Sequence, residues 1–302
     1  MSPVRVHMFA RVTFVCAIAA LASQPFAAAA DAITRTVYLT ITDAKGAAVG
    51  DLTPANFKVK EGGKDREVVK AAPATNKARL ALMVEDRLVG DHQTRLGLFE
   101  FVKKMNGIAE ISLISIGLSN TTIVPFTTDT NTLLKAINEL TLNPQPTSNL
   151  TECLSDMAKI FQKDKPERPV IVAVAFSGGQ AGGGTASSVL TELRQSGATL
   201  FAVTFGPPSS ANNTNPNLST MGDESGREQV LGDGAKQSGG RRFEVVTTAA
   251  IQKALFQVAD DLAAQYQVSY ALPDGVKPDK RFNLTVDRKG LTVRTPQALP
   301  DK

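Results

Sequence analysis

The sequence predicts a doubly wound α/β domain with a mostly parallel sheet, flanked by strands that form a small β-sandwich. Short, continuous apolar runs predict strands buried on both faces, and they lie at 79–84, 111–116, 170–176 and 198–205. Segments with helical spacing of apolar residues separate them, and this alternation is typical of a parallel sheet with helices on both sides. Period-two patterns at both ends of the chain predict the additional strands.

The first 30 residues predict a signal peptide. Arg5 and Arg11 supply a basic region, residues 12–22 form an apolar run, and small residues then lead to a cleavage site near Ala28 or Ala30. A buried helix is the alternative, but the basic flank and the alanine-rich end disfavour it. We therefore expect a periplasmic or secreted protein.

Removal of the signal peptide changes the composition that bears on function. The formal net charge falls from +4 to +2 because Arg5 and Arg11 leave, so charge gives no case for nucleic acid or a membrane surface as partner. No later segment is apolar enough to span a membrane. Cys153 is then the only cysteine, which excludes a disulfide within the chain. The expected partner is an unidentified extracytoplasmic protein, and the oligomeric state stays open.

Region 31–74 follows, and its alternating residues predict strands at 35–42, 57–60 and 67–71 with turns at 43–46 and 61–64. Region 266–302 closes the chain, with strands predicted at 266–271, 281–287 and 291–295. Neither region has enough strands to bury a face by itself. The two regions are therefore predicted to pair into one β-sandwich.

Region 75–265 between them contains the predicted α/β domain. Asp129 and Ser187 are candidate N-caps, because short polar side chains there can accept from free backbone N–H groups. Cys153 lies on one apolar helical face with Leu150, Leu154 and Met157, which predicts a buried, structural cysteine. The predicted helices lie at 94–105, 130–140, 150–161, 187–195 and 248–265.

Three separated segments resemble one known family in order. They are VYLTITDAKGAAVGDLTPANFKVKEGG, SGGRRF, and DDLAAQYQVSYALP followed by KRFNLTVDRKGLTVRT. Together they resemble the von Willebrand factor A-related proteins first catalogued in Acidobacteria. The resemblance implies an α/β domain of von Willebrand factor A type, which often carries a metal-ion-dependent adhesion site. Such a site uses D-x-S-x-S after the first strand, a threonine from a second loop and an aspartate after the fourth strand. These ligands hold Mg²⁺ with one position open for a partner's carboxylate.

The chain departs from this pattern at all three loops. Glu85 or Asp86 can stand at the first carboxylate, but neither register keeps the serines, whose places hold Arg87, Leu88, Val89 or Gly90. Ser148, or Thr147, could replace the threonine, and Ser177 stands where the second aspartate is expected. The resemblance thus implies a degenerate site with candidates Glu85, Asp86, Ser148 and Ser177, and no Mg²⁺ cofactor is expected. Alternatively, Glu85 and Asp86 are a surface acidic pair at a strand end.

The Ser177-Gly178-Gly179 segment carries the alternative function, a hydrolase or a nucleotide-binding protein. Residues 178–185 lie between a strand and a helix like a phosphate-binding loop, but Gly184 stands where the lysine is required. His92 could approach Ser177 as a general base, although no G-x-S-x-G elbow and no clear orienting carboxylate are present. Both activities are disfavoured by these missing groups.

The hypothesis from the sequence is a non-catalytic adhesion or scaffold protein. Residues 206–226 are long, polar and without periodicity, which indicates either a mobile insertion or part of a binding surface. They follow the carboxyl end of a predicted strand, where open α/β sheets bind ligands. The predicted partner-binding rim comprises Asp86, Arg87, Asp91, Thr147, Ser148, Ser177 and Gly178.

Overall fold

The computed structural model describes residues 33–142, 148–177, 184–206 and 218–301, with the side chains of residues 218–224 left undescribed. The predicted signal peptide, Thr147 and Gly178 lie outside the described residues. Within the described part of the chain, no helix is long and apolar enough to cross a membrane.

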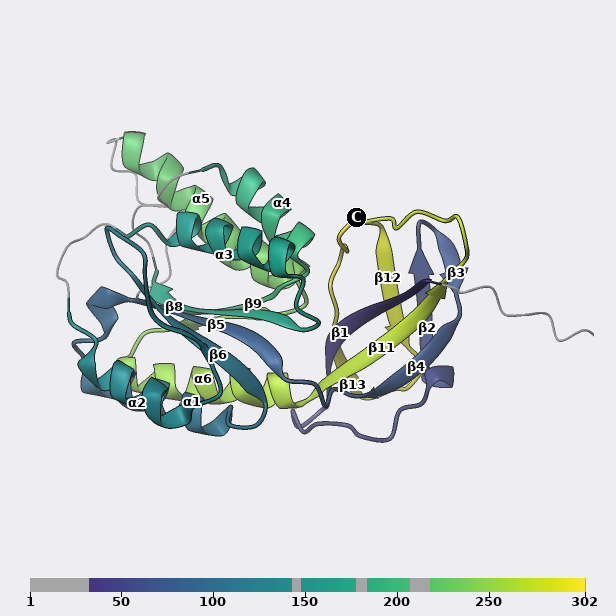
Figure 1. Ribbon diagram of the computed structural model, residues 1–302, viewed down its shortest axis with the longest axis horizontal. Helices are drawn as coiled ribbons and strands as arrows, with labels where there is room; N and C mark the ends of the chain where they lie inside the picture. Colours follow the sequence, from purple (N-terminus) through teal and green to yellow (C-terminus); the bar gives the residue numbers. More distant parts are fainter. Residues whose placement is uncertain (1–32, 143–147, 178–183, 207–217, 302) are drawn as a thin grey trace, which may run out of the picture. The chain divides into compact units, whose positions relative to one another are not determined.

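The centre of the α/β domain is a six-stranded sheet with the order β10-β9-β8-β5-β6-β7 (Figure 1). Its strands are β5 (Ala78–Glu85), β6 (Ala109–Ile116), β7 (Thr121–Thr127), β8 (Pro169–Phe176), β9 (Thr199–Phe205) and β10 (Arg241–Val245). Every pairing in this sheet is parallel except that of β7 with β6. Strand β5 lies between β6 and β8, so its last residue lies among the carboxyl ends of the inner strands, away from the outer strands of the sheet.

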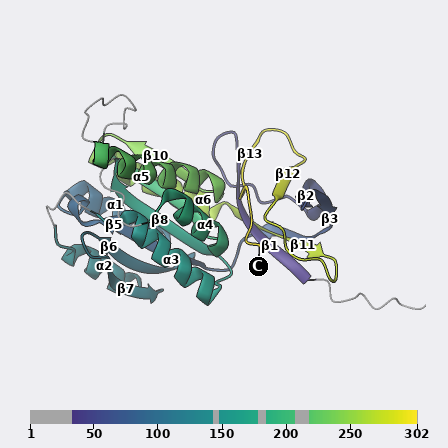
Figure 2. The ribbon, with the colours of Figure 1, turned by 90° about the horizontal axis from the view of Figure 1, so that it is seen from above.

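Helices cover both faces of this sheet. One layer contains α1 (His92–Lys104), α2 (Thr130–Glu139) and α6 (Thr248–Ala263), and the other contains α3 (Leu150–Asp164), α4 (Ala186–Ser196) and α5 (Leu218–Gln237). The two layers lie on opposite sides of the strands in Figure 1, and Figure 2 shows the sheet and helices from above. This is the doubly wound arrangement predicted from the sequence.

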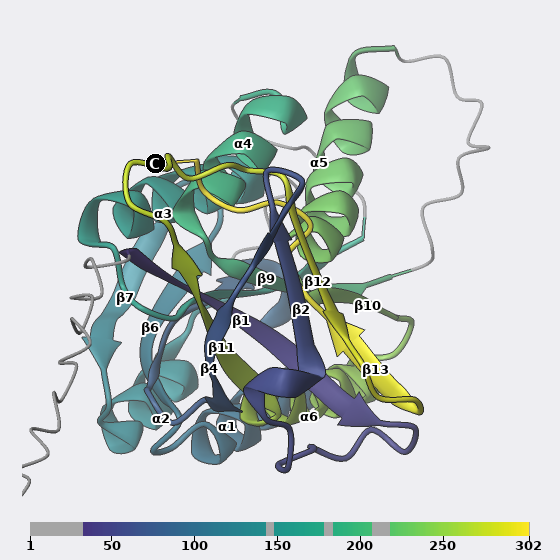
Figure 3. The same cartoon turned by 90° about the vertical axis from the view of Figure 1, so that its right-hand side faces the viewer.

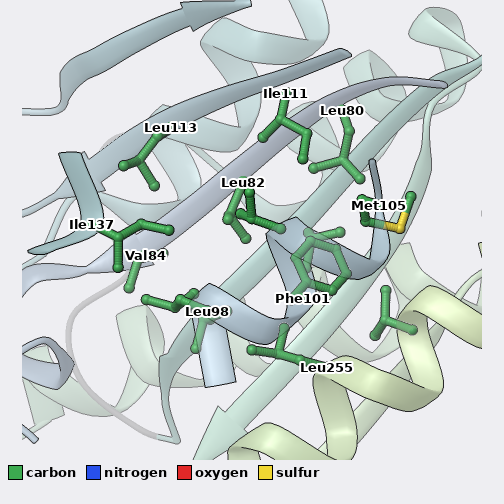
Figure 4. Packing of buried hydrophobic residues seen from close by; sticks show 14 of the residues in the cluster. Leu80, Leu82, Val84, Leu98, Phe101, Met105, Ile111, Leu113, Ile137 and Leu255 are labelled. Carbon is green, nitrogen blue, oxygen red and sulfur yellow. The ribbon is translucent and has the colours of Figure 1, made fainter. Parts of the chain in front are cut away.

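Strand β5 illustrates why the apolar runs are continuous. Leu80, Leu82 and Val84 pack in the cluster that contains α1, α2 and α6 (Figure 4), whereas Ala81 and Met83 pack in the cluster on the other side. Successive side chains of a strand point to opposite faces. A strand with helices on both faces therefore buries nearly all of its residues, and alternation disappears from its sequence.

The flanking strands form two antiparallel sheets, with orders β13-β1-β11-β4 and β12-β2-β3 (Figure 3). The strands are β1 (Ile33–Asp43), β2 (Phe57–Glu61), β3 (Lys64–Arg66), β4 (Val68–Pro73), β11 (Gln265–Leu272), β12 (Phe282–Val286) and β13 (Leu291–Arg294). Both sheets contribute to one buried cluster, which includes Leu39, Phe57, Tyr266 and Phe282. The predicted fold class, with N- and C-terminal strands in a small β-sandwich, is confirmed.

Several local predictions were wrong. The long loop predicted at 206–226 is shorter, because α5 begins at Leu218. Three strands went unpredicted: β7 and β10 at the sheet edges, where few side chains are buried, and the three-residue β3. Thr185, rather than Ser187, is the N-cap of α4, and its hydroxyl accepts from the Ser188 backbone N–H at 3.2 Å.

Cys153 lies on the buried face of α3, as its sequence spacing predicts. Its thiol is packed with Leu150, Leu154 and Met157 in the cluster beneath α3 and α4. Burial, together with the smaller effect of the negative charges of Asp156 and Glu152, raises the pKa of the thiol to about 12. The reactive thiolate is therefore scarce near neutral pH.

We predict that Cys153 resists a thiol reagent at pH 8 in the folded protein. The rate should be about a hundredfold or more below that in urea, because unfolding restores both access and an ordinary thiol pKa. Absorbance of the released thiolate after addition of an aromatic disulfide measures this rate. Complete labelling of the folded protein within seconds would contradict the buried placement.

Candidate functional site

The candidate site lies at the carboxyl ends of β5 and β8. Glu85 is the last residue of β5 and is fully buried between the neighbouring strands. In open α/β sheets, ligands bind outside the carboxyl ends of the strands, because loops from neighbouring strands converge there. This end of the sheet is also where the resemblance places a metal site.

Both carboxylate oxygens of Glu85 accept hydrogen bonds. The Ser148 hydroxyl and the Arg227 Nη2, at 2.8 Å, both donate to Oε1, and the backbone N–H of Phe176 donates to Oε2 at 2.6 Å. A buried carboxylate without such partners would cost several kcal/mol in lost hydration. The charge of Glu85 is therefore compensated within the protein.

Arg227 supplies the compensating positive charge from α5. Its side chain is fully buried, and it forms an ion pair with Glu85. The guanidinium also donates from Nη1 to the Ser148 hydroxyl at 2.9 Å and from Nη2 to the Phe176 carbonyl oxygen at 2.8 Å. We name Glu85, Ser148, Arg227 and the backbone of Phe176 the Glu85–Arg227 cluster.

The backbone around the cluster holds Ser148 in place. Asn149 begins the turn into α3, and its backbone N–H donates to the Gly117 carbonyl oxygen at 3.0 Å, just beyond β6. The Asn149 side-chain amide donates to the Leu118 carbonyl oxygen at 2.6 Å. These bonds attach the loop before α3 to the end of β6, so the Ser148 hydroxyl lies beside the end of β5.

This arrangement does not fit a divalent ion at Glu85. The carboxylate already accepts three hydrogen bonds, one of them from a cation. A +2 ion about 4 Å from the guanidinium would be repelled by about 8 kcal/mol at an effective dielectric constant of about 20. Glu85 and Ser148, two of the four candidates for the degenerate metal site, instead hold the side chain of Arg227.

Asp86 follows Glu85 in the short 3-10 helix η2 (Asp86–Leu88) and is also buried, with 8% of its surface exposed. A Cβ at Gly117 would lie 2.3 Å from its Oδ2, so a larger residue there would displace the Asp86 carboxylate. The interpretation of Glu85 and Asp86 as a surface acidic pair is therefore wrong. Burial of two adjacent acids requires partners, and for Glu85 these are the donors described above.

The other described rim residues, Arg87, Asp91 and Ser177, have contacts of their own near the cluster. The Arg87 guanidinium lies 4.4 Å from the centre of the Phe176 ring, a cation–π contact. Asp91 is the N-cap of α1 and accepts from the Thr94 backbone N–H at 3.0 Å. Ser177 follows β8, and its backbone N–H donates to the Phe205 carbonyl oxygen at 2.8 Å. Thr147 and Gly178 are outside the described residues.

The residues of the alternative function are described only in part. His92 is exposed at the first position of α1. The glycine-rich segment is described only from Gly184 onward, where Thr185 caps α4. A hydrolase or nucleotide site at Ser177-Gly178-Gly179 stays a prediction.

Two arginines of this region were missed in the sequence. Arg227 precedes Val230 and Leu231 by three and four residues, and both are buried, so this spacing could have placed it on the inner face of a helix. Arg95 of α1 donates to four backbone carbonyl oxygens, those of Val89, Ile137, Asn138 and Leu140. It thereby holds the rim segment after β5 against the end of α2.

We predict strong coupling between Glu85 and Arg227. Arg227→Met should lower the free energy of unfolding by about 3–5 kcal/mol, because it leaves the buried carboxylate without its counter-charge. Adding Glu85→Gln to this variant should restore part of the loss, and urea unfolding of the single and double variants measures the coupling.

Lys58→Met is the control, because Lys58 and its ion-pair partner Asp287 are both largely exposed. This variant should unfold almost as the unchanged protein does. Additive effects of Arg227→Met and Glu85→Gln would contradict the assigned ion pair.

Comparison with known proteins gives one family. The family model described as von Willebrand factor type A domain matches residues 77–237. No curated protein matches the chain. Solved structures with similar folds include proximal thread matrix protein 1 from the mussel byssus, with 13% identity and a TM-score of 0.48 over 65% of this chain and 48% of that one. This chain thus covers about half of the mussel protein.

Two bacterial structures are also similar. The conserved hypothetical protein BatB from Bacteroides thetaiotaomicron has 14% identity and a TM-score of 0.42, over 62% of this chain and 98% of that one. The von Willebrand factor domain of the type V pili tip protein Mfa5 from Porphyromonas gingivalis has 11% identity and a TM-score of 0.44, over 62% and 95%.

Proposed function

Because the chain belongs to the von Willebrand factor type A domain family, we propose that it is an exported, non-catalytic protein that binds another protein without a metal ion. The partner is an unidentified protein outside the cytoplasm. The leader-like first 30 residues support export. The Glu85–Arg227 cluster supports binding without Mg²⁺.

The buried guanidinium of Arg227 is the observation that carries this proposal. In the metal-dependent sites that the resemblance implies, the ion has an open position for a partner's carboxylate. Arg227 is fully buried and its Nη atoms donate to Ser148, Glu85 and the Phe176 carbonyl. These contacts all lie within the protein, so a partner has to be recognised by the exposed groups around the cluster.

Two exposed leucines on the rim offer such groups. Leu118 is 54% exposed and lies where Asn149 attaches the loop before α3. Leu142 is 53% exposed and packs against the Gly90 backbone, where a Cβ would lie 3.1 Å from it. The centres of protein interfaces are apolar and surrounded by polar groups. Arg87 and Asp91, on the segment after β5, are polar residues of the same rim, so these leucines suit a protein partner.

We predict that Mg²⁺ does not bind at the carboxyl ends of the strands. Calorimetric titration of the purified protein with MgCl₂ should give only the heat of dilution, since Glu85 already carries its counter-charge. Saturable binding that Glu85→Gln abolishes would contradict the proposal. A binding isotherm unchanged by this substitution would place an ion elsewhere and leave the cluster as described.

We further predict capture of a partner through the rim. The tagged protein should retain the same protein from envelope extract with and without EDTA, and should retain none from cytoplasmic extract. The double variant Leu118→Asp with Leu142→Asp should reduce capture about tenfold or more, because charge is disfavoured in an interface centre.

Ile160→Asp is the matched control, because Ile160 is 42% exposed on α3 and lies three turns from the loop that holds Ser148. Capture should persist with this variant. Loss of capture in EDTA, or equal loss with Ile160→Asp, would contradict rim binding without a metal.

A further inference from the structure

A second hollow lies away from the Glu85–Arg227 cluster, where residues of α5, β10 and β13 meet. Its volume is about 460 Å³, within the range of roughly 300–1,000 Å³ that is usual for small-molecule sites. Lys236 of α5, Arg241 and Arg242 of β10, and Arg294 of β13 line it, together with Thr295. Four of its lining residues are therefore basic, and none is acidic.

Arg241 and Arg294 share one carboxylate. Asp261 of α6 pairs with Arg241 at 3.4 Å from Nε to Oδ2, and with Arg294 through its other oxygen. Burial lowers the pKa of Arg241, the Asp261 charge opposes this, and the charge of Arg294 lowers it again. One negative charge thus faces two positive charges, which leaves an excess of positive charge beside the hollow.

The other two cations differ in their pairing. Arg242 is neutralised by Glu228, at 2.6 Å, and by Glu244, at 3.3 Å. Lys236 is exposed and makes no ion pair among the described residues. The four cations therefore face three carboxylates, those of Asp261, Glu228 and Glu244, which leaves one positive charge in excess. Among the described residues, Lys236 is the lining cation without a carboxylate partner.

Hydrogen-bond donors are also left over at this place. Arg294 Nε and the Thr295 hydroxyl are buried, and neither has a hydrogen-bond partner among the described residues. A buried donor without a partner costs about 1–3 kcal/mol, so such groups are rare in stable proteins. Both atoms belong to residues that line the hollow, and both are covered by protein atoms.

The SGGRRF segment explains how these groups come together. A Cβ at Gly240 would lie 2.0 Å from the Leu200 carbonyl oxygen, and one at Gly239 would lie 2.8 Å from the Pro296 nitrogen. Only glycine permits both approaches. The two glycines therefore let the chain after α5 pass between β9 and the segment after β13, with both arginines at the hollow.

We propose that this hollow binds a phosphate group, either as inorganic phosphate or as a phosphate ester. Its four cations come from three elements, and guanidinium groups match phosphate oxygens through paired hydrogen bonds. The site is separate from the rim and does not depend on the function proposed above.

Isothermal titration calorimetry of the purified protein tests the proposal. The probes are inorganic phosphate and glycerol 3-phosphate, with sodium chloride at equal ionic strength to measure general screening. We expect saturable binding of at least one phosphate probe. Inorganic phosphate alone would indicate a free-ion site, and glycerol 3-phosphate alone would indicate a site for esters.

Lys236→Gln is the first variant, because Lys236 is exposed and its loss should leave the fold intact. It should weaken phosphate binding about tenfold, the effect of one charge-assisted hydrogen bond. Arg294→Gln should weaken it at least as much, with circular dichroism as the check on folding. Lys135→Gln on α2 is the control, since Lys135 is also an exposed helical lysine.

The proposal is overturned if neither phosphate probe gives more heat than chloride. It is also overturned if Lys135→Gln weakens binding as much as Lys236→Gln, because the effect would then reflect only net charge. Failure of this experiment says nothing about capture through the rim, so the two proposals stand or fall separately.

Discussion

The buried carboxylate of Glu85 is the constraint on which the loops at the carboxyl ends of the central strands depend. It ends the middle strand, where water is excluded by the surrounding loops and helices, so its charge has to be met by protein groups. The groups that donate to this carboxylate come from three other parts of the chain: the loop before α3, the end of β8, and α5. One charged side chain thereby fixes how these segments meet.

The same solution recurs elsewhere in the molecule. Glu61 in the β-sandwich is fully buried and pairs with Arg35 of a different sheet, while the Asp279 backbone N–H donates to it at 2.8 Å. Arg168 is buried after α3 and donates to the Gln265 side chain at 2.7 Å. The described residues contain no disulfide, and distant segments are joined through buried polar groups with several partners. Such groups favour one arrangement, because every other arrangement leaves charges unpaired.

The sequence was sufficient for the layers of the fold and insufficient for the cluster. Runs such as 170–176 predict buried strands because burial on both faces leaves a purely apolar pattern. The carboxylate at the end of β5 was also found, since its place follows directly from the strand. Arg227 was missed because α5 contains several glycines and little apolar periodicity, so the segment looked like a loop. Edge strands β7 and β10 were missed because almost none of their side chains are buried, so their sequences show neither a continuous apolar run nor a regular alternation.

The order of strands in the larger antiparallel sheet determines which part of the chain can fold first during biosynthesis. Strand β11 lies between β1 and β4, which are not bonded to each other, and Tyr266 of β11 pairs with Pro73 of β4. The amino-terminal strands therefore wait for their central neighbour until about residue 272 has emerged. The α/β domain, whose strands are all made earlier, can fold first. Until then, β1 and β4 expose unpaired backbone N–H and C=O groups, which a bound chaperone would shield from pairing with other chains.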